Sequence, residues 1–138
     1  RRRGRESEYG VAVLKPFEEL AALLDRLEGR VGREPAASLC DRMAGGLRRY
    51  LERRTSEPAA EMTSFELRLL ARRQDWPDPA QRGIHSVMGL SDRVRFGRFP
   101  ADENEMRRAI ETSRETSRCL EEHIAAAESE TAELETAG

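Results

Sequence analysis

Leu47-Arg-Arg-Tyr-Leu-Glu-Arg-Arg54, Thr63-Ser-Phe-Glu66 and Leu90-Ser-Asp-Arg-Val-Arg-Phe-Gly-Arg-Phe99 follow one another within residues 47–99. The middle stretch has the spacing of a capping box, in which Thr63 accepts from the amide of Glu66 and the Glu66 carboxylate reaches back to the Thr63 amide. The flanking stretches place apolar residues at steps of three and four, as on one face of a helix. These three stretches predict a small helical domain that displays arginine and aromatic side chains.

The same periodicity extends outward in both directions and predicts about five helices. Pro16 suits a first helical position, Gly29 and Gly32 suit a helix end, and Asp78-Pro79 suits another helix start. The expected helices cover residues 16–28, about 34–54, 64–73, 79–95 and about 103–124. Their expected inward faces carry Phe17, Leu20, Leu24, Leu27; Cys40, Met43, Leu47, Tyr50, Leu51; Phe65, Leu69, Leu70; Ile84, Val87, Met88, Ser91, Val94; and Met106, Ile110, Ser113, Ser117, Leu120, Ile124. No segment alternates with period two, so we predict an all-α, irregular bundle without a sheet.

Two glycines, Gly45 and Gly46, interrupt the second expected helix. Each costs about 1 kcal/mol relative to alanine in a helix interior. They would either allow a neighbouring helix to approach closely or mark a bend, and the sequence leaves both interpretations open.

The chain has 138 residues, of which 38% are hydrophobic and 36% are charged, so it fits one domain with a modest core and a heavily solvated surface. We expect residues 1–15 to be a flexible basic segment, residues 16–124 to form the helical domain, and residues 125–138 to be an acidic disordered tail. No apolar run is long enough to cross a bilayer, and there is no signal peptide.

The residues do not favour catalysis or a bound cofactor. His85 and His123 lie on different expected helices without neighbouring ligands, and Cys40 and Cys119 have no CxxC partner. No glycine-rich phosphate loop follows a strand, and no nucleophile has a base within predictable reach. We therefore expect no enzyme activity, no metal and no cofactor.

Arginine and aromatic residues provide the candidate interaction surface. Nearly all the positive charge is arginine, which pairs bidentately with carboxylates, although a GC-rich coding sequence would produce the same bias. The first interpretation of the arginine side chains is a solvated helix face, and that of the aromatic ones is internal packing; an interaction surface is the functional alternative. The candidate interaction residues are Arg48, Arg49, Arg53, Arg54, Trp76, Arg95, Arg98 and Phe99.

The segments Leu47–Arg54, Met62–Glu66 and Asp92–Pro100 together resemble the cytoplasmic C-terminal domain of Bat/MoxR-associated bacterial membrane proteins, the BatD-like oxygen-tolerance proteins and their relatives. Those domains typically carry an LRRYLE-R segment, a T-x-E helix start and a D-x-V-K-F-A-R-F/Y-x-P segment before a final helix. This chain departs from the pattern at Arg95, where lysine is usual, at Gly97, where alanine is usual, and at Ser64-Phe65, where Thr-Glu is commoner.

The resemblance implies a non-catalytic protein–protein interaction domain at the cytoplasmic face of the bacterial inner membrane. It would be anchored by a helix that precedes this chain, and Arg1, Arg2, Arg3 and Arg5 would flank that helix. The implied protein partner is a MoxR-type AAA+ ATPase or a von Willebrand-type domain protein.

Two alternatives remain open at the level of sequence. One is a soluble helix-turn-helix regulator that binds nucleic acid, against which the formal net charge of −2 and the acidic end argue, so we expect no nucleic-acid partner. The other is a structural oligomerisation module built on the seam of the final expected helix.

Overall fold

The computed structural model describes residues 15–97 and 100–137, and over these residues the chain is all-α without a strand, as predicted. Five α-helices and one short 3-10 turn follow in order: α1 (Pro16–Glu28), α2 (Ala36–Thr55), η2 (Ala59–Glu61), α3 (Ser64–Arg73), α4 (Asp78–Arg95) and α5 (Glu103–Ala137). The predicted flexible segment 1–15 lies outside the described residues except for Lys15.

Local chemistry at the helix starts explains most of these boundaries. At α3, the Glu66 amide donates to Thr63 Oγ1 at 3.1 Å and the Thr63 amide donates to Glu66 Oε1 at 2.8 Å, which confirms the capping box. Asp102 and Glu105 form the same reciprocal pair before α5, at 2.8 and 3.2 Å. The predicted start of α4 was wrong by one residue, because Pro77 is the cap and Asp78 is already helical with no side-chain capping bond.

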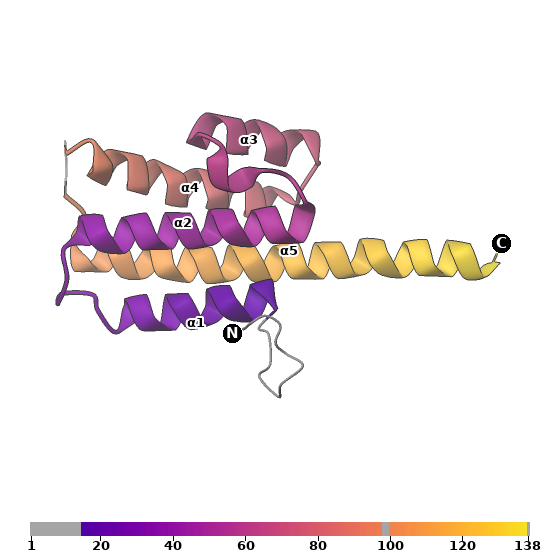
Figure 1. Cartoon of the computed structure of the whole chain (residues 1–138), viewed down its shortest axis with the longest axis horizontal. Coiled ribbons are helices and arrows are strands. Elements are labelled where there is room, and N and C mark those ends of the chain that lie inside the picture. The colour runs from indigo at the N-terminus through magenta and orange to yellow at the C-terminus, as the bar shows by residue number, and fades with distance from the viewer. Residues whose placement is uncertain (1–14, 98–99, 138) are drawn as a thin grey trace, which may run out of the picture.

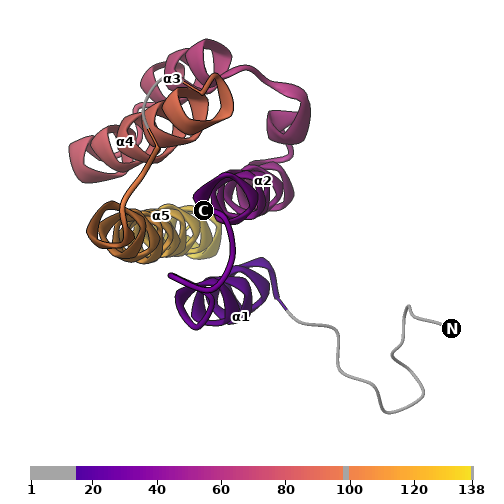
Figure 2. The same cartoon turned by 90° about the vertical axis from the view of Figure 1, so that its left-hand side faces the viewer.

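The helices form an irregular bundle around α5. Helices α2 and α5 lie side by side, with α1 packed against both on one side and α4 packed against both on the opposite side (Figures 1 and 2). Helix α3 packs on α4. The apolar faces expected for α1, α2, α4 and α5 are buried or half-buried, as the sequence predicted. One continuous core results, which includes Leu24, Leu47, Leu70, Ile84 and Ile110.

The predicted inward face of α3 was wrong for two of its three residues. Phe65 is 61% exposed and Leu69 is 40% exposed, whereas Leu67 and Leu70 are fully buried. A helix of 10 residues cannot bury both of its apolar sides when it has neighbours on only one. Helix α3 packs on α4 with its Leu67–Leu70 side, which leaves Phe65 and Leu69 facing solvent.

The glycines of α2 allow close packing and do not bend the helix. Helix α2 is continuous through both positions, and Gly46 is buried. A Cβ atom built on Gly46 would lie 2.2 Å from Leu23 Cδ2, so this glycine allows α1 to approach. A Cβ atom built on Gly45 would meet only the flexible end of the Arg49 side chain, with Nη1 at 3.5 Å, so this position is not a close contact between helices.

Helix α5 runs well past the bundle. It has 35 residues, and the part beyond residue 124 projects as a single rod past the ends of the other helices (Figure 1). We predicted disorder from residue 125, but the helix continues to Ala137. We call residues 125–137 the α5 extension. Its described side chains, those of residues 125–136, are all exposed.

None of the helices in the described ranges 15–97 and 100–137 is both long and apolar enough to cross a membrane.

Candidate protein-interaction surfaces

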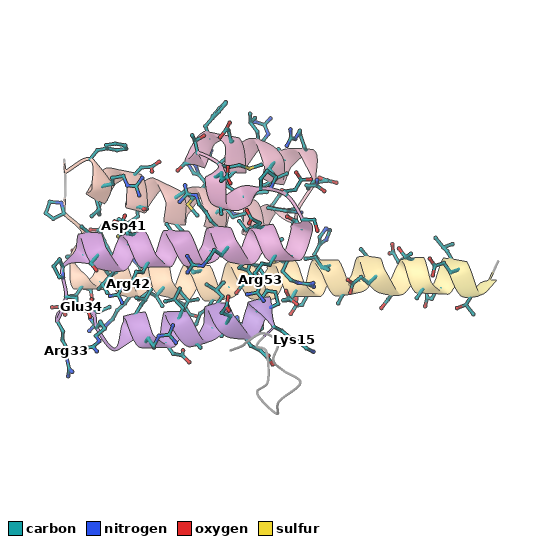
Figure 3. The ribbon with its side chains drawn as sticks, in the orientation of Figure 1. Lys15, Arg33, Glu34, Asp41, Arg42 and Arg53 are labelled. Carbon is teal, nitrogen blue, oxygen red and sulfur yellow. The ribbon has the colours of Figure 1, made fainter. Side chains whose placement is uncertain are left out.

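The arginines of α2 point to different neighbours and do not form one patch. Arg53 lies between α2 and α1, where its guanidinium pairs with Glu19 (Figure 3). Arg49 is exposed and lines a groove of about 420 Å³ between the same two helices. Arg48 and Arg54 face other elements. The predicted common surface is therefore divided among at least three sides of α2.

Arg54 takes part in a hydrogen-bonded group at the point where α5 leaves the bundle. Arg54 Nε and Tyr50 Oη both donate to Glu121 Oε2, each at 2.7 Å, and Tyr50 Oη lies 3.2 Å from the carbonyl oxygen of Ser117. Burial, with the Glu121 carboxylate beside it, holds the pKa of Tyr50 well above its ordinary value. The hydrogen bond that Arg54 donates to Glu121 also raises the pKa of Arg54. These contacts fix α5 to the end of α2, so Arg54 has a structural role here.

Arg48 projects from α2 toward the end of η2, whereas Arg95 is the last residue of α4 and reaches Asp41 of α2. The half-buried Arg48 donates from Nε to the Met62 carbonyl oxygen at 3.2 Å, and burial lowers its pKa. Arg95 is exposed, and its Nη2 atom lies 3.5 Å from Asp41 Oδ1. A long, exposed pair of this kind contributes little to stability. Of the predicted arginines in the described part of the chain, Arg49, Arg53 and Arg95 are exposed, whereas Arg48 and Arg54 are half-buried.

The aromatic candidates do not join the arginines. Trp76 is 4% exposed and belongs to the core, so it is not available as a protruding contact residue. Its carbonyl oxygen accepts from Gln81 Nε2 at 2.8 Å, which fixes the turn between α3 and α4. Arg98 and Phe99 lie outside the described residues.

An apolar surface that the sequence prediction missed lies on α3. Phe65 and Leu69 are one helical turn apart, so their exposed side chains share one side of the helix. Leu69 also lines a groove of about 460 Å³ together with Pro58 and Met62, and Glu61, Glu66 and Arg73 form the polar part of its lining. We call Pro58, Met62, Phe65 and Leu69 the α3 surface. Apolar side chains that gather beside a groove with a polar rim are typical of protein-binding sites.

A second groove lies where α5 passes the ends of α2 and α3. It has a volume of about 440 Å³. Its lining comes from three parts of the chain: Arg54 and Thr55; Gln74 and Trp76; and His123, Ile124, Ala127, Glu128, Thr131, Ala132 and Glu135. We call it the α5 groove. Trp76 and Ile124 give it an apolar base, while Glu128 and Glu135 make one border acidic.

The described residues contain no group of three or more His, Cys, Asp or Glu side chains placed to hold a metal ion. Cys40 is buried, with its Sγ atom 3.4 Å from Met106 Sδ, and burial raises the pKa of its thiol to about 11. A buried thiol that holds its proton this firmly is a poor nucleophile.

No protein-family model matches the chain, and the searches of curated proteins and of solved structures gave no significant match.

Proposed function

We propose that this chain is a non-catalytic protein–protein interaction domain whose main docking site is the α3 surface. The exposure of Phe65 and Leu69 carries this proposal, because these are large apolar side chains that the fold leaves in water beside a groove. Fully burying an exposed side chain of this size contributes about 1.5–3 kcal/mol. Phe65 and Leu69 are already partly covered, so further burial on a partner would contribute about half of that for each, which supports a contact of modest affinity.

The sequence resemblance supports a more specific context for the same domain. We propose that it acts at the cytoplasmic face of a bacterial inner membrane, held there by a helix that precedes this chain. Its partner would be a MoxR-type AAA+ ATPase or a von Willebrand-type domain protein. The support is the similarity of segments 47–54, 62–66 and 92–100 to the Bat/MoxR-associated domains and the arginines at positions 1–3 and 5. Phe65 stands where those domains more commonly carry glutamate, so the apolar part of this surface would be specific to this chain's own partner.

The test is direct binding between purified proteins. The wild-type chain is titrated with the MoxR-type ATPase and with the von Willebrand-type protein of the same organism, and the double variant Phe65→Ser/Leu69→Ser is titrated in parallel. The matched control is Arg68→Ser/Arg72→Ser, which changes two exposed residues of the same helix. We expect the apolar double variant to bind at least about tenfold more weakly and the control to bind within about threefold of wild type.

Two results would reject this assignment. If neither protein binds the wild-type chain, the Bat/MoxR context is wrong. If the apolar variant and the control bind equally well, the α3 surface is not the docking site. Circular dichroism of both variants must match wild type, which we expect because every substituted side chain is exposed.

The geometry favours protein partners over nucleic acid. Helices α3 and α4 are joined by a short turn, but α4 packs against α2, α3 and α5. In its middle, the exposed residues are Arg82, His85, Ser86 and Gly89, which include a single arginine. A recognition helix needs a denser set of basic and polar side chains facing the groove of the duplex. The seam on which the oligomerisation alternative depends packs within this chain up to residue 124, since Met106, Ile110 and Leu120 are buried and Ile124 is half-buried.

A further inference from the structure

We infer that the α5 groove, together with the α5 extension, binds an amphipathic helix of a partner protein that carries lysine or arginine beside its apolar stripe. This site shares no residue with the α3 surface and goes beyond the function proposed above. Four features of the described residues support it.

The first feature is an apolar stripe that continues past its own bundle. The residues of α5 that pack into the core, from Met106 to Ile124, alternate in steps of four and three along the helix. The same steps continue to Ala127, Thr131 and Leu134, whose side chains are exposed. Leu134 is 74% exposed. A stripe with this spacing is the interface that a second helix packs against in a coiled coil.

The second feature is that the groove provides a base for such a helix. Trp76 is almost fully buried, yet it lines the groove beside Ile124 and Ala127. The Tyr50–Glu121–Arg54 group fixes α5 immediately before this point. A docking helix would therefore meet a rigid apolar corner at one end and follow the α5 extension from there.

The third feature is charge of one sign. The segment from Glu121 to Ala137 contains six glutamates and no lysine or arginine. Glu128 and Glu135 are seven residues apart and both line the groove. Residues one heptad apart beside an apolar seam are those that form ion pairs with the facing helix in a coiled coil. The complementary partner therefore carries basic residues at the same spacing.

The fourth feature is that the extension is a poor helix by itself. It lacks packing partners, and its glutamates lie at the C-terminal end of α5, where the helix dipole disfavours negative charge. A basic helix would relieve both problems at once. A second copy of this chain would not, because two such extensions would bring glutamates against glutamates.

The experiment uses the full chain and two synthetic peptides of about 21 residues, or three heptads. Both peptides carry the same leucines and isoleucines at the seam positions. One has lysine at the flanking positions and the other has glutamate there. Binding is measured by fluorescence anisotropy at low and at physiological salt. We expect the lysine peptide to bind and the glutamate peptide to bind at least about tenfold more weakly.

Matched charge reversals locate the site. We expect Glu128→Lys/Glu135→Lys to weaken binding of the lysine peptide by about tenfold or more. Glu122→Lys/Glu133→Lys makes the same change in charge on the same helix, but at exposed residues that neither line the groove nor flank the seam, and it should lose at most about threefold. The Phe65→Ser/Leu69→Ser variant should bind the peptide as wild type does, which separates this site from the α3 surface.

Any one of three outcomes would overturn the inference: that the lysine peptide does not bind, that the two charge-reversed variants weaken binding equally, or that both peptides bind the wild-type chain equally well. Sedimentation of the chain alone provides a fourth test. A concentration-dependent dimer that Leu134→Glu abolishes would assign the stripe to a second copy of this chain.

Discussion

The contact between α4 and α5 allows a test of the fold with an internal control. Gly83 is buried in α4, and a Cβ atom built there would lie 1.9 Å from Thr116 Oγ1 and 3.2 Å from Thr116 Cβ on α5. Gly89 lies on the same helix but is exposed, with no atom within 4 Å of its Cβ position. Replacing either glycine by alanine brings the same gain in helix propensity, about 1 kcal/mol. The difference between the two variants therefore isolates the contact with Thr116.

The magnitude follows from the cost of overpacking. The hydroxyl of Thr116 can rotate away, but its Cβ is fixed to the backbone of α5, so the two helices must separate by a few tenths of an ångström. Forcing an extra methyl group into a packed contact costs about 1–3 kcal/mol. We expect Gly89→Ala to gain up to about 1 kcal/mol and Gly83→Ala to lose about 0–2 kcal/mol.

Urea unfolding followed by circular dichroism measures both variants, with equal m-values required for the comparison. If Gly83→Ala is as stable as Gly89→Ala, the close approach of α4 and α5 is wrong. Thr116→Gly supplies the complementary test, because it removes both the Oγ1 atom and the Cβ atom that face the new methyl group. In a double-mutant cycle, Gly83→Ala should cost less in the Thr116→Gly background than in the wild type.

Three further predictions test the helix start, the turn and the buried thiol. Thr63→Ala removes the cap of α3 and should lower the free energy of unfolding by about 1 kcal/mol in urea titrations, whereas an unchanged value would show that the cap is dispensable. Trp76→Ala should destabilise the domain by about 3–5 kcal/mol in the same assay, whereas a loss below about 1 kcal/mol would mean that the ring is not core. Burial raises the pKa of Cys40 from 9.0 to about 11, so the folded state holds this proton more firmly than the unfolded state. Its contribution to the free energy of unfolding is therefore fully present below about pH 9. As the pH rises to about 11, we expect the free energy of unfolding to fall by about 2 kcal/mol. Stability measured across this range should fall more steeply for wild type than for Cys40→Ala, and equal slopes would contradict the burial of the thiol.

The starts of α1, α3 and α5 could be predicted from the sequence because their causes are local. The capping pair at Thr63 involves only groups three residues apart, and Pro16 fixes its own backbone angle at the first position of α1. The core face of α2 could also be predicted, since Met43, Leu47 and Leu51 follow one another at steps of four residues and lie on one side of the helix. These features do not depend on which helix packs against which.

The orientation of α3 could not be predicted, because it depends on a neighbour. Apolar residues stand on both sides of this short helix, with Phe65 and Leu69 on one side and Leu67 and Leu70 on the other. Periodicity alone does not choose between the two. The contact with α4 buries the second pair, and the first pair is left to form the α3 surface.

For the length of α5, composition and spacing predict different structures. Its composition beyond residue 125 is acidic and rich in small residues, which is typical of disorder. The steps of four and three nevertheless continue through Thr131 to Leu134. The spacing was the better guide to structure, because the bundle has already nucleated α5 and each added residue then costs little to keep helical.

The arginines of α2 show why a cluster in the sequence need not be a cluster in space. Neighbouring helix residues point about 100° apart, so two adjacent pairs, Arg48–Arg49 and Arg53–Arg54, spread around the helix and do not form a single row. Only Arg49 and Arg53 are four residues apart and share a side, and that side faces α1. Arg54 is committed to Glu121 and Arg48 to a backbone carbonyl. A docking partner that needs a row of guanidinium groups would not find one on α2, whereas an apolar partner would find the α3 surface and a basic helix would find the glutamates of α5.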